Sequence, residues 1–450
     1  MNLRSPKGQL LSREPHSAAL ARLRVSYDGI PIQVSTISTA FSLHNHPLPP
    51  KIPAHYPAHC AHYLLLHCIG MIRPDLSSLP AYVPGASIPN ALKLASNESS
   101  LAPLPSVSAA INDATSHLNR YPDMASGALR EKLAQWLGVD LANVAVGNGS
   151  SALCQQLVQA TCQDGDEVVY AWRSFEAYPI LCKIAGAVGV GVPLKRGRHD
   201  LEAMSEAIGE RTRLVFVCNP NNPTGTTVGR EEFREFMARV PEDVTVVLDE
   251  AYVEYNRDAE SPVALEELKR YPNLAVCRTF SKAYGLAGLR LGYMVGPEGL
   301  VEAVNKVGIP FGVNALAQAA GVASVDAQAE LAARVDATVV ERERVEAYLA
   351  GVAGDLASGG AGADGEPLTY PSQTNFVWLN AGERAEALDD ALKREGVIAR
   401  CFAGEGVRVT VTTAEETDVL LRALGRALPA AGLAGAGAES AGPQASPQAD

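Results

Sequence analysis

The chain has 450 residues, of which 47% are hydrophobic and 20% are charged, and its formal net charge is −12. This composition is typical of a globular protein with a large core and two domains. The negative charge argues against nucleic acids and anionic membranes as main partners. The chain contains no apolar run of about 18 residues, so we expect no transmembrane helix. The eight cysteines show no paired spacing, which favours reduced, buried thiols in a cytoplasmic protein.

Residues 1–70 differ in composition from the rest of the chain. They contain seven of the nine histidines and a cluster of prolines, but no lasting amphipathic period. The histidines and cysteines at 55–68 match no common zinc spacing, so we predict no metal site. The apolar stretch at 63–71 is too short and too far from the N-terminus for a secretory signal. We expect 1–70 to be a disordered extension, or upstream sequence included through a misplaced start codon.

Two kinds of pattern alternate along the rest of the chain. Short apolar runs, typical of strands buried on both faces, alternate with segments that have apolar residues at helical spacing. This alternation favours an α/β fold with a doubly wound, mostly parallel sheet. We predict helices at 105–119, 129–137, 152–160 and 325–349, and strands at 144–146, 167–171, 214–218, 244–248, 274–277 and 374–379.

These patterns divide the chain beyond residue 70 into four regions. Residues 71–105 are rich in proline and small residues, and we interpret them as an arm that forms part of a small domain. Residues 106–334 form the large α/β domain, and 335–428 form a small α+β domain. The Ala/Gly/Ser/Pro-rich residues 429–450 predict a disordered tail.

A glycine-rich turn follows the predicted strand at 144–146 and opens the next helix. It contains Gly149, Ser150 and Ser151. Exposed backbone amides and the positive end of a helix bind phosphate well. A single turn of this kind is weak support for a phosphate site, but a lysine and an arginine later in the chain strengthen it.

Two of the predicted buried strands end in polar residues. The strand at 214–218 is followed by Asn-Pro-Asn-Asn-Pro-Thr-Gly, which includes Asn222, and the strand at 244–248 is followed by Asp249 and Tyr252. An aspartate at the end of a buried strand needs a cationic partner. Because open α/β sheets bind ligands at the carboxyl ends of their strands, we expect a ligand here.

The most informative stretch follows the predicted strand at 274–277. Lys282 lies there among small hydroxyl residues and glycines, with Arg290 eight residues on. A poorly solvated lysine loses part of its preference for the charged form, and its free amine can form a Schiff base with an aldehyde. An arginine can hold a phosphate through two hydrogen bonds. Together these groups match the needs of pyridoxal phosphate.

Residues 281–290, Ser-Lys-Ala-Tyr-Gly-Leu-Ala-Gly-Leu-Arg, resemble the cofactor-lysine motif of fold-type I aminotransferases, in the histidinol-phosphate and aromatic aminotransferase branch. The resemblance covers about 71–428. It implies a homodimer with pyridoxal 5'-phosphate in the large domain, and amino transfer between an aromatic L-amino acid (phenylalanine or tyrosine) and a 2-oxo acid such as 2-oxoglutarate. The cofactor residues it implies, with Lys282 catalytic, are Phe175, Asn222, Asp249, Tyr252 and Lys282 at the ring, and Gly149, Ser150, Ser151, Thr279, Ser281, Arg290 and the partner subunit's Tyr121 at the phosphate.

The resemblance also implies four residues that face the substrate. They are Arg408 for the α-carboxylate, Asn375 near it, Asn97 at the mouth of the substrate site, and Arg400 where histidinol-phosphate enzymes hold the substrate phosphate. The residues after Arg400, Cys-Phe-Ala-Gly-Glu-Gly, are closer to the aromatic branch. Histidinol-phosphate aminotransferase remains the alternative, followed by a decarboxylase of a phosphorylated amino acid and by a binding protein that keeps the fold without turnover.

Overall fold

The computed structural model describes residues 25–27, 30–32, 73, 76, 79, 88–354 and 366–433, in two compact units, 1–72 and 73–450. In the first unit, β1 (Val25–Tyr27) pairs antiparallel with β2 (Ile30–Ile32), a short hairpin that the sequence did not predict. The rest of 1–70, including its histidines, lies outside the described residues. Within the described part of the chain, no three His, Cys, Asp or Glu residues are placed to hold a metal ion, and no helix is long and apolar enough to cross a membrane.

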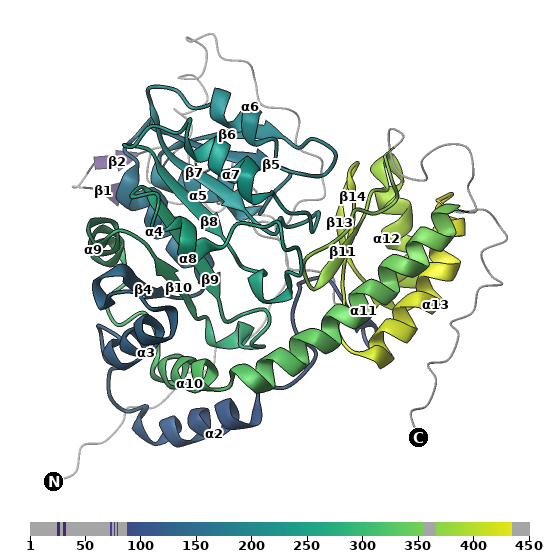
Figure 1. Ribbon diagram of the computed structural model, residues 1–450, viewed down its shortest axis with the longest axis horizontal. Coiled ribbons are helices and arrows are strands. Elements are labelled where there is room, and N and C mark those ends of the chain that lie inside the picture. Colours follow the sequence, from purple (N-terminus) through teal and green to yellow (C-terminus); the bar gives the residue numbers. More distant parts are fainter. Residues whose placement is uncertain are drawn as a thin grey trace. The chain divides into compact units, whose positions relative to one another are not determined.

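The second unit is built on a seven-stranded sheet with the order β4-β10-β9-β8-β7-β5-β6 (Figure 1). The five strands from β9 to β6 are parallel, and β10 runs antiparallel to both of its neighbours. The strands are β4 (Val144–Gly147), β5 (Glu167–Trp172), β6 (Val188–Pro193), β7 (Thr212–Cys218), β8 (Thr245–Asp249), β9 (Leu274–Thr279) and β10 (Gly292–Val295).

Helices cover both faces of this sheet. Alternate residues of β7 point to opposite sides, so Phe216 packs in one core with α4, α5 and α9, and Val215 packs in another with α6 and α7. The doubly wound arrangement is the predicted one. The helices of this domain are α2 (Pro105–Ala114), α3 (Gly127–Leu137), α4 (Ser150–Thr161), α5 (Ala177–Ala185), α6 (Leu201–Glu206), α7 (Arg230–Met237), α8 (Ala264–Glu267), α9 (Glu298–Val307) and α10 (Ala315–Asp326).

A smaller domain packs three helices on an antiparallel sheet with the order β11-β14-β13. The strands are β11 (Phe376–Leu379), β13 (Arg400–Phe402) and β14 (Gly406–Thr410), and the helices are α11 (Gln328–Gly354), α12 (Ala385–Arg394) and α13 (Ala414–Ala430). The long α11 leads from α10 to this domain (Figure 1). In the arm, β3 (Leu92–Lys93) pairs with β12 (Val397–Ile398), so the arm contributes to the small domain.

Most predicted elements differ from the observed ones at their ends, in general by one or two residues. The first helix ends at Ala114, because Thr115 and Ser116 donate side-chain hydrogen bonds to the carbonyls of Asn112 and Asp113 and so compete with the helix. The last helix, α13, was not predicted from the sequence, and it ends at Ala430, past the predicted domain limit at residue 428.

Residues 429–433 belong to the small domain, since Leu433 is buried in its core, so the predicted tail begins too early. The predicted helix at 325–349 is two helices, α10 and α11, which meet at Ala327 without a glycine or proline to mark the break. The strand predicted at 274–277 continues to Thr279, where it pairs with Gly292 of β10.

Candidate active site

Three neighbouring parallel strands deliver the central residues of the candidate site. Asp249 is the last residue of β8, and its register partners are Cys218 at the end of β7 and Cys277 near the end of β9. Asn222 and Lys282 follow β7 and β9, so all three side chains lie at the same edge of the sheet.

Asp249 is a buried carboxyl with one oxygen still available. The Tyr178 hydroxyl donates to its Oδ2 at 2.7 Å, and the Cys154 Sγ lies 3.9 Å from the same oxygen. Its Oδ1 has no hydrogen-bond partner among the described residues. Burial raises the pKa of Asp249 to about 6, although the hydrogen bond from Tyr178 opposes the shift. A buried carboxylate oxygen of this kind fits a protonated ring nitrogen.

Lys282 presents its amine to the same space. Its Nζ donates to the Ser96 carbonyl at 3.1 Å and lies 5.7 Å from the centre of the Tyr252 ring. Burial, together with the positive charges of Arg408 and Arg290, lowers the pKa of Lys282 to about 7. Near neutral pH a large fraction of this amine is therefore unprotonated and able to act as a nucleophile or a base.

The glycine turn and Arg290 form a cradle at the start of α4. Arg290 donates to the Ser281 Oγ at 3.2 Å and to the Ser151 Oγ at 3.5 Å. Gly149 has a φ of +82°, and a Cβ built on it would lie 2.6 Å from Arg290 Nη2. The turn thus brings hydroxyls, a helix N-terminus at Ser150 and a guanidinium to one place, which fits a phosphate.

Thr279 differs from these residues. Its hydroxyl accepts the Ser281 N–H at 3.1 Å and donates to the Leu291 carbonyl at 3.4 Å, so it supports the loop. The lysine amine with its lowered pKa, the available carboxylate oxygen and the cradle together fit pyridoxal phosphate.

Hydrogen bonds connect the candidate ring contacts with the candidate substrate residues. Asn97 Nδ2 donates to the Tyr252 hydroxyl at 2.9 Å, and Asn375 Nδ2 donates to the Asn97 carbonyl at 3.2 Å. Arg408 donates to Asn222 Oδ1 and, at 2.7 Å, to the Ala95 carbonyl. Asn97, Tyr252 and Asn375 therefore form one buried hydrogen-bonded group, and Arg408 and Asn222 form another. The two groups meet at arm residues 95–97, and together they make up the polar network of the site.

Three predicted residues lie at the margin of this network. Phe175 is partly buried, with its ring edge-on to Tyr178 at 5.5 Å between centroids. Arg400 is held by Glu176 at 2.9 Å. Tyr121 is 83% exposed and its ring lies 4.8 Å from that of Phe311, so this chain alone does not bring it into the site.

The structure also places residues that the sequence analysis did not single out. Tyr178 contacts Asp249, and Glu176 contacts Arg400. Asn221 accepts hydrogen bonds from Ser174 and His199, which fixes the backbone just before Asn222. The position of Tyr178, three residues after Phe175 at the start of a helix, was the only indication in the sequence that it faces the same space.

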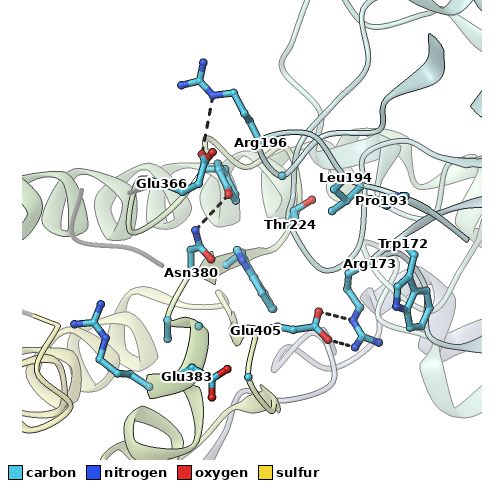
Figure 2. Close-up of a pocket in the computed structure, with 17 residues that line it drawn as sticks. Trp172, Arg173, Pro193, Leu194, Arg196, Thr224, Glu366, Asn380, Glu383 and Glu405 are labelled. Atoms are coloured by element: carbon cyan, nitrogen blue, oxygen red, sulfur yellow. Dashed lines mark hydrogen bonds and ion pairs between the residues drawn. The ribbon is translucent and has the colours of Figure 1, made fainter. Parts of the chain in front are cut away.

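A cavity of about 740 Å³ lies between the large and small domains and is lined by residues of both. Figure 2 shows Trp172 and Arg173 on one side and Glu405 on the other, with the ion pair between Arg173 and Glu405 across it. None of the predicted site residues lines this cavity.

Comparisons with known proteins agree with this geometry. A family model for class I and II aminotransferases matches residues 89–424. The chain is 90% identical over 380 residues to an aromatic amino acid aminotransferase of Corynebacterium jeikeium, covering 84% of this chain and 100% of that protein. It is 53% identical over 354 residues to the enzyme of the same name from Corynebacterium glutamicum, covering 78% and 98%.

Among solved structures, it resembles the histidinol-phosphate aminotransferase of Sinorhizobium meliloti in complex with pyridoxal-5'-phosphate. The TM-score is 0.71 and the identity 30%, covering 80% of this chain and 97% of that one. The predicted fold type is confirmed by this likeness. By sequence and by fold, the chain belongs to the class I and II aminotransferases.

Proposed function

We propose that this chain transfers an amino group between an aromatic L-amino acid, such as phenylalanine or tyrosine, and a 2-oxo acid such as 2-oxoglutarate, with pyridoxal 5'-phosphate as cofactor. The main support for this cofactor is the buried Asp249, which has one carboxylate oxygen available in the same site as the amine of Lys282, whose pKa is lowered. The relatives at 90% and 53% identity, which are named aromatic amino acid aminotransferases, support the substrate class.

The cofactor, when bound, supplies an aldehyde for exchange of amino groups and a ring that accepts the electrons released when the substrate Cα loses its proton. Asp249 would face the ring nitrogen. Phe175 would cover one face of the ring, and Asn222 and Tyr252 would contact its 3-oxygen. Gly149, Ser150, Ser151, Ser281 and Arg290 would hold the phosphate, with Thr279 behind them.

Lys282 moves the proton in this account. Its amine is unprotonated in a large fraction of molecules above about pH 7, so Nζ can accept the proton from the substrate Cα. In the second half of the reaction the same nitrogen returns a proton to the Cα of the new amino acid. Because Nζ also touches the Ser96 carbonyl, the lysine is oriented towards the arm when it is free.

Arg408 binds the substrate α-carboxylate in this proposal. It is buried and is positioned by hydrogen bonds to Asn222 and to the Ala95 carbonyl. Asn375 Nδ2 donates one of its two hydrogens to the Asn97 carbonyl, and its second N–H would donate to the carboxylate, with Asn97 behind it. A guanidinium next to an amide can hold a carboxylate in a fixed orientation, which aligns the Cα proton with Lys282.

We also propose a homodimer and a cytoplasmic location. The exposed ring of Tyr121, stacked near Phe311, supports a role for Tyr121 in the site of a second copy. The cysteines of the described residues are all free, which suits a reducing compartment. The domain limits proposed are 71–105 for the arm, 106–334 for the cofactor domain and 335–433 for the small domain.

The direct test is turnover with identified products. The purified protein with pyridoxal phosphate, phenylalanine and 2-oxoglutarate should form phenylpyruvate and glutamate in equal amounts. The Lys282→Ala variant should lose this activity, because it has neither the nucleophile nor the base. A wild-type protein that binds the cofactor but forms no phenylpyruvate, or full turnover by the variant, would contradict the proposal.

A further inference from the structure

Arg400 lies next to the guanidinium that we assign to the substrate carboxylate. In the β13–β14 pair, Arg400 is the direct register partner of Arg408. Partners in an antiparallel pair point to the same face and have Cβ atoms about 5 Å apart. Phe402 lies on this face as well, 5.6 Å from the Arg400 guanidinium and 5.9 Å from that of Arg408. Two cations therefore flank one ring at the same end of the site.

Glu176 neutralises one of these two cations. Its carboxylate accepts hydrogen bonds from Arg400 Nη2 at 2.9 Å and 3.1 Å. Glu176 follows Phe175 directly at the start of α5, so the carboxylate comes from the large domain and the guanidinium from the small domain. Both side chains are partly buried, with 39% and 30% exposed, which reduces screening by solvent.

The contacts of Arg408 are of a different kind. Arg408 donates hydrogen bonds to two neutral oxygens, Asn222 Oδ1 and the Ala95 carbonyl, whereas Arg400 donates to the Glu176 carboxylate. An α-carboxylate carries one negative charge, and a phosphate monoester carries up to two at neutral pH and has a third oxygen to bind. A site with Arg408 alone matches the carboxylate, and a site with Arg408 and an available Arg400 would match the phosphate.

We propose that Glu176 determines specificity at the anion end of the substrate. By holding Arg400, Glu176 leaves Arg408 as the guanidinium for the substrate anion, and so favours amino acids over amines that carry a phosphate ester in place of the carboxylate. This inference rests on the proposed amino transfer and names a residue that selects its substrate. Glu176 acts through Arg400 and touches no reacting atom, so it is a specificity-determining residue and not a catalytic one.

The same domain boundary provides a matched control. Arg173 of the large domain pairs with Glu405 of the small domain, with the charges reversed relative to Glu176 and Arg400. Arg173 is also 4.2 Å from the centre of the Trp172 ring and 5.3 Å from that of Phe402. Removing Glu405 therefore breaks an ion pair between the same two domains without making Arg400 available.

The experiment compares two substrates that differ only at the anion end, L-phenylalanine and L-phenylalaninol phosphate. In the holoenzyme, Glu176→Gln should raise the ratio of kcat/KM for the phosphate ester to that for phenylalanine at least tenfold, about 1.4 kcal/mol. Glu405→Gln should leave this ratio within about twofold. The double variant E176Q/R400Q should return to the wild-type ratio. Inorganic phosphate should inhibit the E176Q variant at a lower concentration than the wild type.

An unchanged ratio in the E176Q variant, or an equal rise in the E405Q variant, would overturn the inference, because the pair would then only join the domains. Failure of the proposed function has a different signature, since the wild type would then not turn over phenylalanine. In that case the Kd of the holoenzyme for inorganic phosphate still compares the variants, because the cofactor then fills the cradle at Arg290. Equal Kd values for E176Q and wild type would overturn the role of Glu176.

Discussion

Asp249→Asn tests whether the buried carboxylate is kept for the cofactor at the expense of stability. The substitution keeps the size of the side chain and can still accept the hydrogen bond from Tyr178. It removes the negative charge from a residue that is 2% exposed and has an oxygen with no partner in the described part of the chain. We therefore expect opposite effects on the cofactor-free protein and on cofactor binding.

The pKa of Asp249 gives the size of the effect on the cofactor-free protein. A carboxyl raised from 3.8 to about 6 is harder to ionise in the folded state than in the unfolded state. The folded protein therefore loses stability as the pH rises from about 4 to about 6, and above that range the loss is about 3 kcal/mol. For a chain of this size, that corresponds to a rise of about 3 °C in the Tm of the D249N variant at pH 8.

Cofactor binding should change in the other direction. Breaking a buried ion pair by removing one partner costs about 3–5 kcal/mol, which weakens binding by at least about a hundredfold. The assay measures the Tm of the cofactor-free proteins at pH 5 and pH 8, and the Kd for pyridoxal phosphate by absorbance. Glu250→Gln is the control: Glu250 is buried next to Asp249 but pairs with Arg278 at 2.7 Å, so the E250Q variant should be less stable.

Two results would refute this reasoning. One is a D249N variant that binds pyridoxal phosphate as tightly as the wild type. The other is a cofactor-free D249N variant that is less stable than the wild type at pH 8, as E250Q is expected to be.

Three further predictions concern the cradle, the lysine and the N-terminal segment. Gly149→Ala should weaken cofactor binding at least tenfold, because the added Cβ would lie 2.6 Å from Arg290 Nη2. Gly165→Ala is the control: its φ of +83° is similar and it has no neighbour within 4 Å, so this change should affect only stability. Equal Kd values of the two variants for pyridoxal phosphate would contradict the prediction. The rate at which the cofactor-free protein reacts with pyridoxal phosphate should rise with pH around a midpoint near 7, because the pKa of Lys282 is lowered, and a midpoint near 10 would refute that shift. Deleting residues 1–70 should leave kcat/KM for phenylalanine within about twofold, and a larger loss would show that the segment contributes to the site.

The sequence predicted the parts of the site that depend on local pattern. Asp249 is the last residue of a buried strand and Lys282 follows the end of another, and the glycine turn precedes α4 next to Arg290. Each of these follows from a short stretch of residues whose chemistry and spacing are unusual. The family resemblance then assigned Arg408 to the carboxylate, and the structure places it in the same buried network.

Tertiary contacts between distant residues could not be predicted in this way. Tyr178 and Asp249 are 71 positions apart, and Arg400 and Glu176 are 224 apart. No local pattern predicts such pairs, because they depend on how α5 packs on the sheet and on how the large and small domains pack together. For the same reason the break at Ala327 was missed: the apolar period continues across it, and no glycine or proline interrupts the pattern.

The proposed site accepts aromatic amino acids through a single guanidinium, that of Arg408. The most direct measurement is a half-reaction titration of the holoenzyme, in which phenylalanine or histidinol phosphate is added without a 2-oxo acid and the loss of the cofactor's long-wavelength absorption is followed. We predict that phenylalanine converts the enzyme at a much lower concentration than histidinol phosphate. A preference of about a hundredfold for histidinol phosphate, about 2.7 kcal/mol, would show that the site is built for a phosphate ester and not for an amino acid.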